Sequence, residues 1–304
     1  MKKKWDNVSF ELINKIEKHI LKSGFPFEWS VRDEVIRANK ILIEKMDNDD
    51  PPNEVYFKNY YIDFQEKKLR ENDIAWNYFY SFYSINKKNE KYGIHCNYYF
   101  ECKQSEKYNL IFFSEPISSM FEISHSINLS TLSILPDEIL KANNNKLAQY
   151  QYNHLSNICY SYTMFPEGND LIRSAIYQAF SPGLAEYYEH ITFLKEEKIS
   201  EVLSDSFLIF PVVVFSGNMF ECVYSKNKIE IAPTKHIMLS VTDSIKPGKF
   251  GKNFIVDFVR ADYLRTFLNL KVDEIINIID SLKNKKFEIT GKQISWLKAW
   301  YFGE

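Results

Sequence analysis

An α/β fold is predicted by three observations along this chain of 304 residues. Apolar residues at helical spacing dominate its first part, three strand-like runs follow, and a further helix precedes another apolar strand. A hydrophobic share of 45% is enough for a sizeable core, and a charged share of 26% is ordinary for a globular protein. No internal repeat or low-complexity linker divides the chain. A single α/β domain with an insertion is therefore the simplest account.

Helices are expected where apolar residues recur every three or four positions. Pro26 is favourable in the first turn of a helix, because its missing N–H has no helical partner there. Within a later helix, Pro182-Gly183 is expected to cause a break or a kink. The expected helices cover residues 8–22, 26–46, 171–185, 272–282 and 294–300.

Strands are expected where β-branched and aromatic residues cluster between polar segments. The charged stretch 86–92 joins the second and third strands and predicts an antiparallel pair, and two later strands are predicted to form a hairpin. Residues 114–169 show no clear pattern and are treated as an insertion. The expected strands are 55–64, 73–85, 94–103, 207–215, the hairpin 219–223 with 229–231, and 254–259.

Composition excludes several classes of protein. The net charge of −2 and the pI of about 6.4 give no general basic excess, so binding of nucleic acid would need a local patch, metal ions or a partner. Four cysteines without CxxC spacing suggest neither a zinc site nor a disulfide framework. No signal peptide is expected, and the longest apolar run, Phe207–Phe215, is too short to cross a bilayer. We therefore expect a cytoplasmic protein with no membrane partner.

The most informative stretch is residues 93–113, which read as a buried strand containing two charges. Side chains two apart on a strand share a face, so Glu101 and Lys103 project together, opposite the face that holds Cys102. Burying such a pair costs several kcal/mol unless each group has a partner or a task. One interpretation is a metal-binding carboxylate beside a lysine that orients water. The alternative is an internal ion pair with a role in folding only.

Asp73 is the acid that we expect to meet this pair. It lies where polar sequence turns apolar, at the start of the strand that precedes Glu101. In an antiparallel pair the start of one strand lies beside the end of the other, which brings Asp73 toward Glu101 and Lys103. Two carboxylates and a backbone carbonyl make a sparse oxygen site of the kind that Mg²⁺ accepts. The alternative for Asp73 is a surface pair with Arg70.

These residues resemble the PD-(D/E)XK restriction-endonuclease-like nuclease superfamily. The resemblance rests on Glu101-Cys102-Lys103 in an apolar strand with Asp73 upstream, although no proline precedes Asp73. It implies a core of the order α-β-β-β-α-β, with a central mixed sheet flanked by helices, an insertion and a C-terminal helical extension. The whole chain, residues 1–304, would be one nuclease-like domain, with its core at about 20–215 and the extension at about 216–304.

Further motifs extend the likeness and imply two more site residues. Gly24-Phe25-Pro26-Phe27-Glu28 resembles the block that opens the first helix in one branch of these nucleases, where the helix acid holds or orients the metal. Gln178 resembles a glutamine that in some members follows the catalytic strand. Glu28 could instead pair with Arg32 on the helix surface, and Gln178 could be an ordinary polar helix residue. Tyr60–Asp63 and Arg70–Ile74 resemble the successive strand motifs of the same branch.

The resemblance implies metal-dependent hydrolysis of phosphodiester bonds. Mg²⁺, for which Mn²⁺ can substitute, would be held by Asp73, Glu101, the backbone carbonyl of Cys102 and Glu28. Lys103 would contact the attacking water and the phosphate. DNA is the favoured substrate and RNA is not excluded. A role in anti-phage defence or restriction is implied, beside a partner such as an ATPase or as a homo-oligomer. The competing interpretation is a gated or inactive nuclease-fold protein that binds nucleic acid or docks a partner.

Overall fold

The computed structural model describes residues 9–46, 54–63, 67–83, 91–105, 107–116, 157–166, 171–196, 205–225, 227–242 and 253–283. Its helices are α1 (Phe10–Lys22), α2 (Phe25–Lys45), α5 (Leu171–Glu196) and α6 (Leu264–Lys283), with a 3₁₀ turn, η1 (Ala261–Tyr263). Its strands are β1 (Glu54–Ile62), β2 (Leu69–Tyr83), β3 (Lys91–Lys103), β4 (Asn109–Pro116), β5 (Asn157–Phe165), β6 (Asp205–Phe215), β7 (Met219–Ser225), β8 (Lys228–Pro233), β9 (His236–Thr242) and β10 (Asn253–Arg260).

These strands form one mixed sheet in the order β1-β2-β3-β6-β10-β9-β5-β4-β7-β8. The meander β1-β2-β3 is antiparallel, whereas β6 runs parallel to both β3 and β10. The expected order α-β-β-β-α-β is present as α2, β1, β2, β3, α5 and β6, with β4 and β5 inserted before α5. The predicted α/β class and central mixed sheet are thus confirmed.

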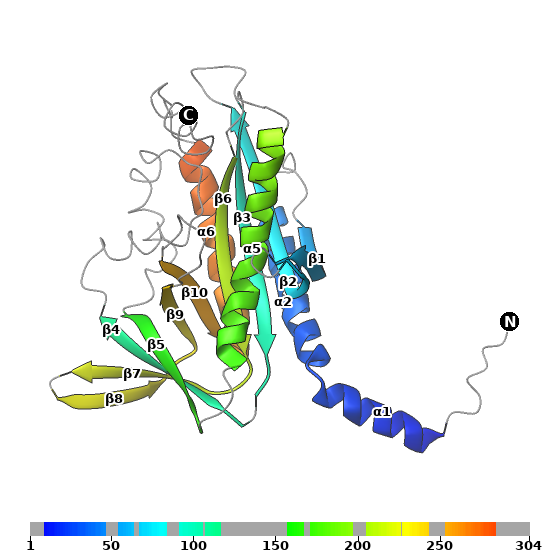
Figure 1. Cartoon of the computed structure of the whole chain (residues 1–304), viewed down its shortest axis with the longest axis vertical. Coiled ribbons are helices and arrows are strands. Elements are labelled where there is room, and N and C mark those ends of the chain that lie inside the picture. The colour runs from blue at the N-terminus through cyan, green and yellow to red at the C-terminus, as the bar shows by residue number, and fades with distance from the viewer. Residues whose placement is uncertain are drawn as a thin grey trace.

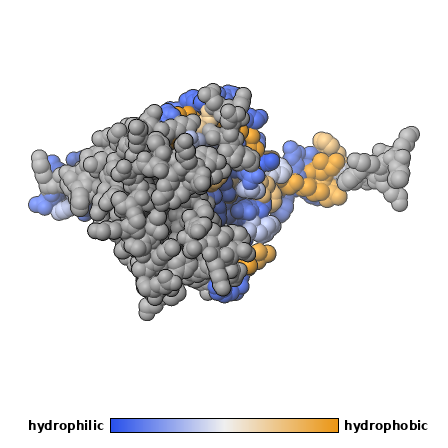
Figure 2. All heavy atoms as spheres, turned by 90° about the horizontal axis from the view of Figure 1, so that it is seen from above, coloured by the Kyte–Doolittle hydropathy of each residue, from blue (hydrophilic) through white to orange (hydrophobic). Residues whose placement is uncertain are grey.

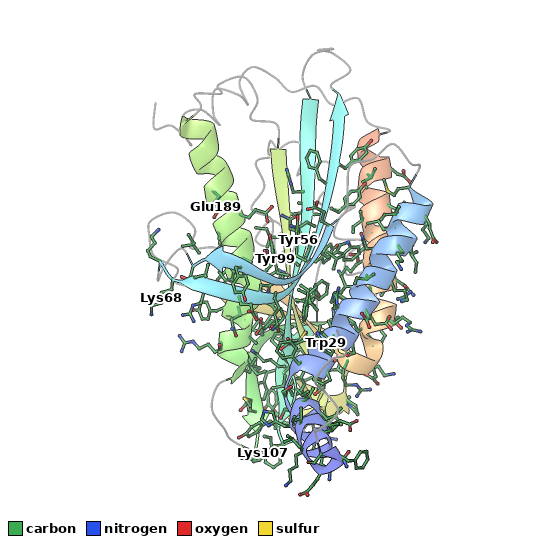
Figure 3. The ribbon with its side chains drawn as sticks, turned by 90° about the vertical axis from the view of Figure 1, so that its right-hand side faces the viewer. Trp29, Tyr56, Lys68, Tyr99, Lys107 and Glu189 are labelled. Carbon is green, nitrogen blue, oxygen red and sulfur yellow. The ribbon has the colours of Figure 1, made fainter. Side chains whose placement is uncertain are left out.

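Helices cover both faces of the central strands, with α5 on one side and α2 and α6 on the other (Figure 3). The alternation of β6 shows why, because Val212 and Val214 pack into the core under α2 and α6, whereas Val213 and Phe215 pack into the core under α5. A strand buried on both faces is therefore continuously apolar. This explains why Phe207–Phe215 could be recognised from the sequence.

The C-terminal part differs from the helical extension that was expected. The described residues after Phe215 contribute four strands, β7 to β10, and β10 lies inside the sheet between β6 and β9. The hairpin of β7 and β8 was predicted correctly, but β9 was missed and α6 begins eight residues before the expected Val272. The helix expected at 294–300 lies outside the described residues.

The expected break at Pro182 is absent, because α5 continues through it from Leu171 to Glu196. Proline cannot donate to the carbonyl four residues earlier, that of Gln178, so packing must compensate. Gly183, the next residue, lies against the sheet. A Cβ built on it would lie 2.5 Å from Ile209 Cγ2 and 3.0 Å from Tyr99 Cε2. The missing side chain of Gly183 therefore allows helix and sheet to approach closely beside the proline.

A buried network of charges ties α6 to the sheet. Asp257 on β10 lies 2.7 Å from His236 Nε2 and 3.9 Å from Lys271 Nζ, and Lys271 Nζ lies 2.9 Å from Glu274 Oε2. All four side chains are almost fully buried, and burial raises the pKa of Glu274 to about 7. Such a network fixes one arrangement of helix on strand, since a shift would leave buried charges unpaired.

Helix α1 extends away from the rest of the molecule (Figure 1). Ser9 caps it, and its large apolar side chains lie mostly exposed, visible as an orange projection in Figure 2. These side chains are Phe10, Leu12, Ile13, Ile16, Ile20 and Leu21. Among the described helices, none is both long enough and apolar enough to span a bilayer.

The contact at Gly183 yields a prediction about stability. Gly183→Ala adds a methyl group where Ile209 and Tyr99 already lie too close for it. We expect a loss of about 2 kcal/mol in the free energy of unfolding, because overpacking outweighs the gain in helix propensity. Urea denaturation measures this change. A variant that is as stable as the wild type, or more stable, would contradict the close packing of α5.

Candidate functional site

The site is built where the paired ends of β2 and β3 meet. Ile74 faces Phe100 in the antiparallel register, so Asp73 comes beside Glu101 at the next position. The backbone N–H of Cys102 donates to Asp73 Oδ2 at 2.8 Å, which fixes the carboxylate against β3. The predicted convergence of these two acids is therefore observed. The Cys102 side chain packs on the opposite face, in the core under α2 and α6.

Glu101 is the most buried carboxylate of the site, with 3% of its side chain exposed. Its Oε1 accepts from Lys103 Nζ at 2.6 Å, whereas its Oε2 has no hydrogen-bond partner among the described residues. Burial raises the pKa of Glu101 to about 7; the charge of Asp73 adds to this rise and Lys103 opposes it. A desolvated carboxylate with one unpaired oxygen is a strong site for a cation.

Gln178 on α5 reaches the same group of residues from across the face of the sheet. Its Oε1 accepts from Lys103 Nζ at 3.3 Å and from Ser174 Oγ, one helical turn away, at 3.1 Å. Lys103 is thereby held between a carboxylate and an amide while 26% of its side chain stays exposed. The sequence motif that suggested Gln178 thus marks a residue at the site.

Glu28 also lies at the site, but its partner is one that the sequence analysis missed. In place of the expected alternative, Arg32, it pairs with Lys58 of β1, with 2.6 Å between Glu28 Oε2 and Lys58 Nζ. The Arg32 guanidinium lies over the Phe57 ring. Lys58 Nζ also lies 2.8 Å from Glu71 Oε1 and 3.3 Å from Asp73 Oδ1.

Lys58 is thus surrounded by three carboxylates from α2 and β2. Burial alone would lower the pKa of Lys58, but its bonds to Glu28 and Glu71 and the charge of Asp73 raise that pKa above its usual range. Glu71, which the sequence analysis did not propose as a site residue, is part of this group. Nothing in the local sequence Phe57-Lys58-Asn59 distinguishes Lys58 from a solvated lysine. The pairing of its two neighbours with β2 places it here.

The site combines four carboxylates, those of Glu28, Glu71, Asp73 and Glu101, with two ammonium groups, so its formal charge is −2. No trio of His, Cys, Asp or Glu side chains in the described ranges is arranged to hold a metal ion, since three of the acids gather around Lys58. The unpaired Glu101 Oε2 nevertheless fits a cation beside Asp73. Oxygen donors of this kind suit Mg²⁺ or Mn²⁺.

Among known proteins, no family model matches the chain, and searches of curated proteins and of solved structures give no match either.

The burial of Glu101 predicts a pH-dependent effect of Glu101→Gln. The folded pKa of about 7 exceeds the value of 4.5 for an exposed glutamate, so the folded state keeps a proton that the unfolded state releases between these pH values. The unfolding free energy of the metal-free wild type therefore falls by about 3 kcal/mol as pH rises through this window. A glutamine at position 101 does not titrate, and its side-chain oxygen can still accept a hydrogen bond from Lys103.

We therefore expect Glu101→Gln in EDTA to match the wild type near pH 4.5 and to be the more stable protein at pH 8. Urea denaturation at the two pH values measures the difference. Glu230→Gln, on the exposed strand β8, serves as the control and should show no such divergence. Equal pH dependence of Glu101→Gln and wild type would mean that Glu101 is not desolvated.

Proposed function

We propose that this protein is a metal-dependent nuclease of the PD-(D/E)XK type, which hydrolyses phosphodiester bonds. The observation that supports this most is the buried, unpaired Oε2 of Glu101, directly beside Asp73 and with Lys103 on the same face. A folding role alone would be served by a fully paired carboxylate. An oxygen without a partner in a site of net negative charge is better explained by a cation that binds there.

Each residue of the site has a separate role in this proposal. Asp73, Glu101 and the backbone carbonyl of Cys102 would hold Mg²⁺ or Mn²⁺, with Glu28 nearby. The bound ion would lower the pKa of a water molecule bound to it and would neutralise negative charge on the phosphate. Lys103 donates hydrogen bonds to Glu101 and Gln178. It would orient the attacking water and offset the negative charge that develops on the phosphate. Gln178 would position Lys103 and take no direct part.

DNA is the proposed substrate, on the strength of the superfamily resemblance. RNA is also compatible with the site, because the groups assembled here would contact the phosphate and not the base. The same resemblance suggests an effector in an anti-phage defence or restriction system, acting in the cytoplasm beside a partner such as an ATPase, or as a homo-oligomer. The chain's net charge of −2 agrees with binding that depends on metal ions or on a partner.

A second candidate function is a nuclease-fold module that docks a partner and cuts only when gated, or not at all. The exposed apolar side chains of α1, which extends from the body, favour it. The acids that gather around Lys58 are compatible with either function.

Lys103→Ala tests the nuclease proposal. Removing this ammonium group should lower the rate of plasmid cleavage in Mg²⁺ or Mn²⁺ by about 10²–10³-fold, since one preorganised charge at the reacting phosphate is lost. The assay uses purified protein, with folding checked by circular dichroism.

Lys107→Ala is the matched control, because Lys107 lies a few residues further on, is exposed and contacts only the Tyr108 ring among the described interactions (Figure 3). It should cleave at the wild-type rate. Equal cleavage by Lys103→Ala and wild type would assign the activity to another site or to a contaminant. Cleavage by none of the three would favour the partner-gated module.

A further inference from the structure

Lys58 has an unusual backbone for a residue in the middle of a strand. Its φ of 58° lies in the left-handed region, which costs a residue with a side chain about 1–2 kcal/mol. The register on both sides is unbroken, with Phe57 opposite Ile74 and Asn59 opposite Asn72. The chain therefore adopts a strained conformation at this one position without changing the pairing of the strands. Strain of this kind persists where surrounding contacts favour it.

The contacts that Lys58 gains are those of a bound cation. Its ammonium group lies within 3.3 Å of carboxylate oxygens from Glu28, Glu71 and Asp73. Two aromatic rings flank it, those of Phe25 at 5.1 Å and Phe57 at 5.7 Å from their centroids. Only 19% of the side chain is exposed. The protein thus supplies a cage of charges and rings for one ammonium group.

Asp73 stands between this cage and Glu101. Its Oδ1 faces Lys58, and its Oδ2 accepts from the N–H of Cys102. On the far side, Glu101 keeps an oxygen without a hydrogen-bond partner, and Lys103 is its one cationic contact among the described residues. Lys58 compensates the outer acids, Glu28 and Glu71, and leaves the inner pair of Asp73 and Glu101 short of positive charge.

We infer that Lys58 is a permanent cation that replaces a second metal ion, so that the site binds a single divalent ion at Asp73 and Glu101. This inference rests on the proposed metal-dependent function. The charges agree with it, since four carboxylates and two ammonium groups leave −2, which one divalent ion neutralises. Without Lys58 the four carboxylates and Lys103 would leave a formal charge of −3, and Glu28 and Glu71 would be free to bind a second ion.

The experiment is a titration of the purified full chain with Mn²⁺, in which electron paramagnetic resonance of free Mn²⁺ gives the number of ions bound. We expect one ion per wild-type chain and two per chain of Lys58→Met. Lys58→Arg keeps the positive charge and should stay at one. The double variant Lys58→Met with Glu28→Gln restores a formal charge of −2 and should also return to one.

Three results would overturn the inference while leaving the proposed function intact. They are two ions bound to the wild type, one ion bound to Lys58→Met at unchanged affinity, and one ion bound to that variant more tightly. The last would mean that Lys58 competes for the same ion. If Lys58→Met does not fold, as judged by circular dichroism, Lys58→Gln replaces it, and the wild-type count still decides. A wild type that binds no Mn²⁺ would overturn the proposed function itself.

Discussion

The desolvation of one carboxylate, that of Glu101, is the constraint on which the rest of the site depends. Taking a carboxylate out of water costs several kcal/mol, and a single ammonium contact, here from Lys103, offsets only part of that cost. Asp73 beside it increases the unfavourable charge. A cation bound between Glu101 and Asp73 would offset the remaining cost of burying these two carboxylates.

Two strands that are neighbours in the sequence, β2 and β3, carry the central residues of the site, and helices from distant parts of the chain add the others. The antiparallel pairing of β2 with β3 sets Asp73 beside Glu101, and the parallel neighbour β6 buries β3 from its other edge. Helix α5 then brings Gln178 across one face, and the start of α2 brings Glu28. Because Gly183 has no Cβ, α5 can approach Ile209 and Tyr99 of the sheet closely enough for this. Stability and site geometry therefore depend on the same helix–sheet contact.

The site residues on β2 and β3 could be predicted from the sequence because their signals are local. Glu101 and Lys103 share a face because of strand alternation, and Asp73 follows from the hairpin-like order of two strands. Lys58 was missed because its role depends on the left-handed backbone and on pairing with β2, neither of which its neighbours in the sequence reveal. The placement of β10 in the middle of the sheet was missed for a similar reason, since strand order depends on contacts distant in the chain. The break that Pro182 predicted as one of two outcomes does not occur, because packing around Gly183 overrides the local helix-breaking signal.

The position of a bound ion can be measured in crystals soaked with Mn²⁺ by its anomalous scattering. We expect one strong peak per chain within coordination distance, about 2–2.5 Å, of carboxylate oxygens of both Glu101 and Asp73. The ammonium group of Lys58 should stay among Glu28, Glu71 and Asp73 when the ion is bound. A crystal saturated with Mn²⁺ that shows no peak at Glu101, or shows its strongest peak elsewhere, would contradict the account.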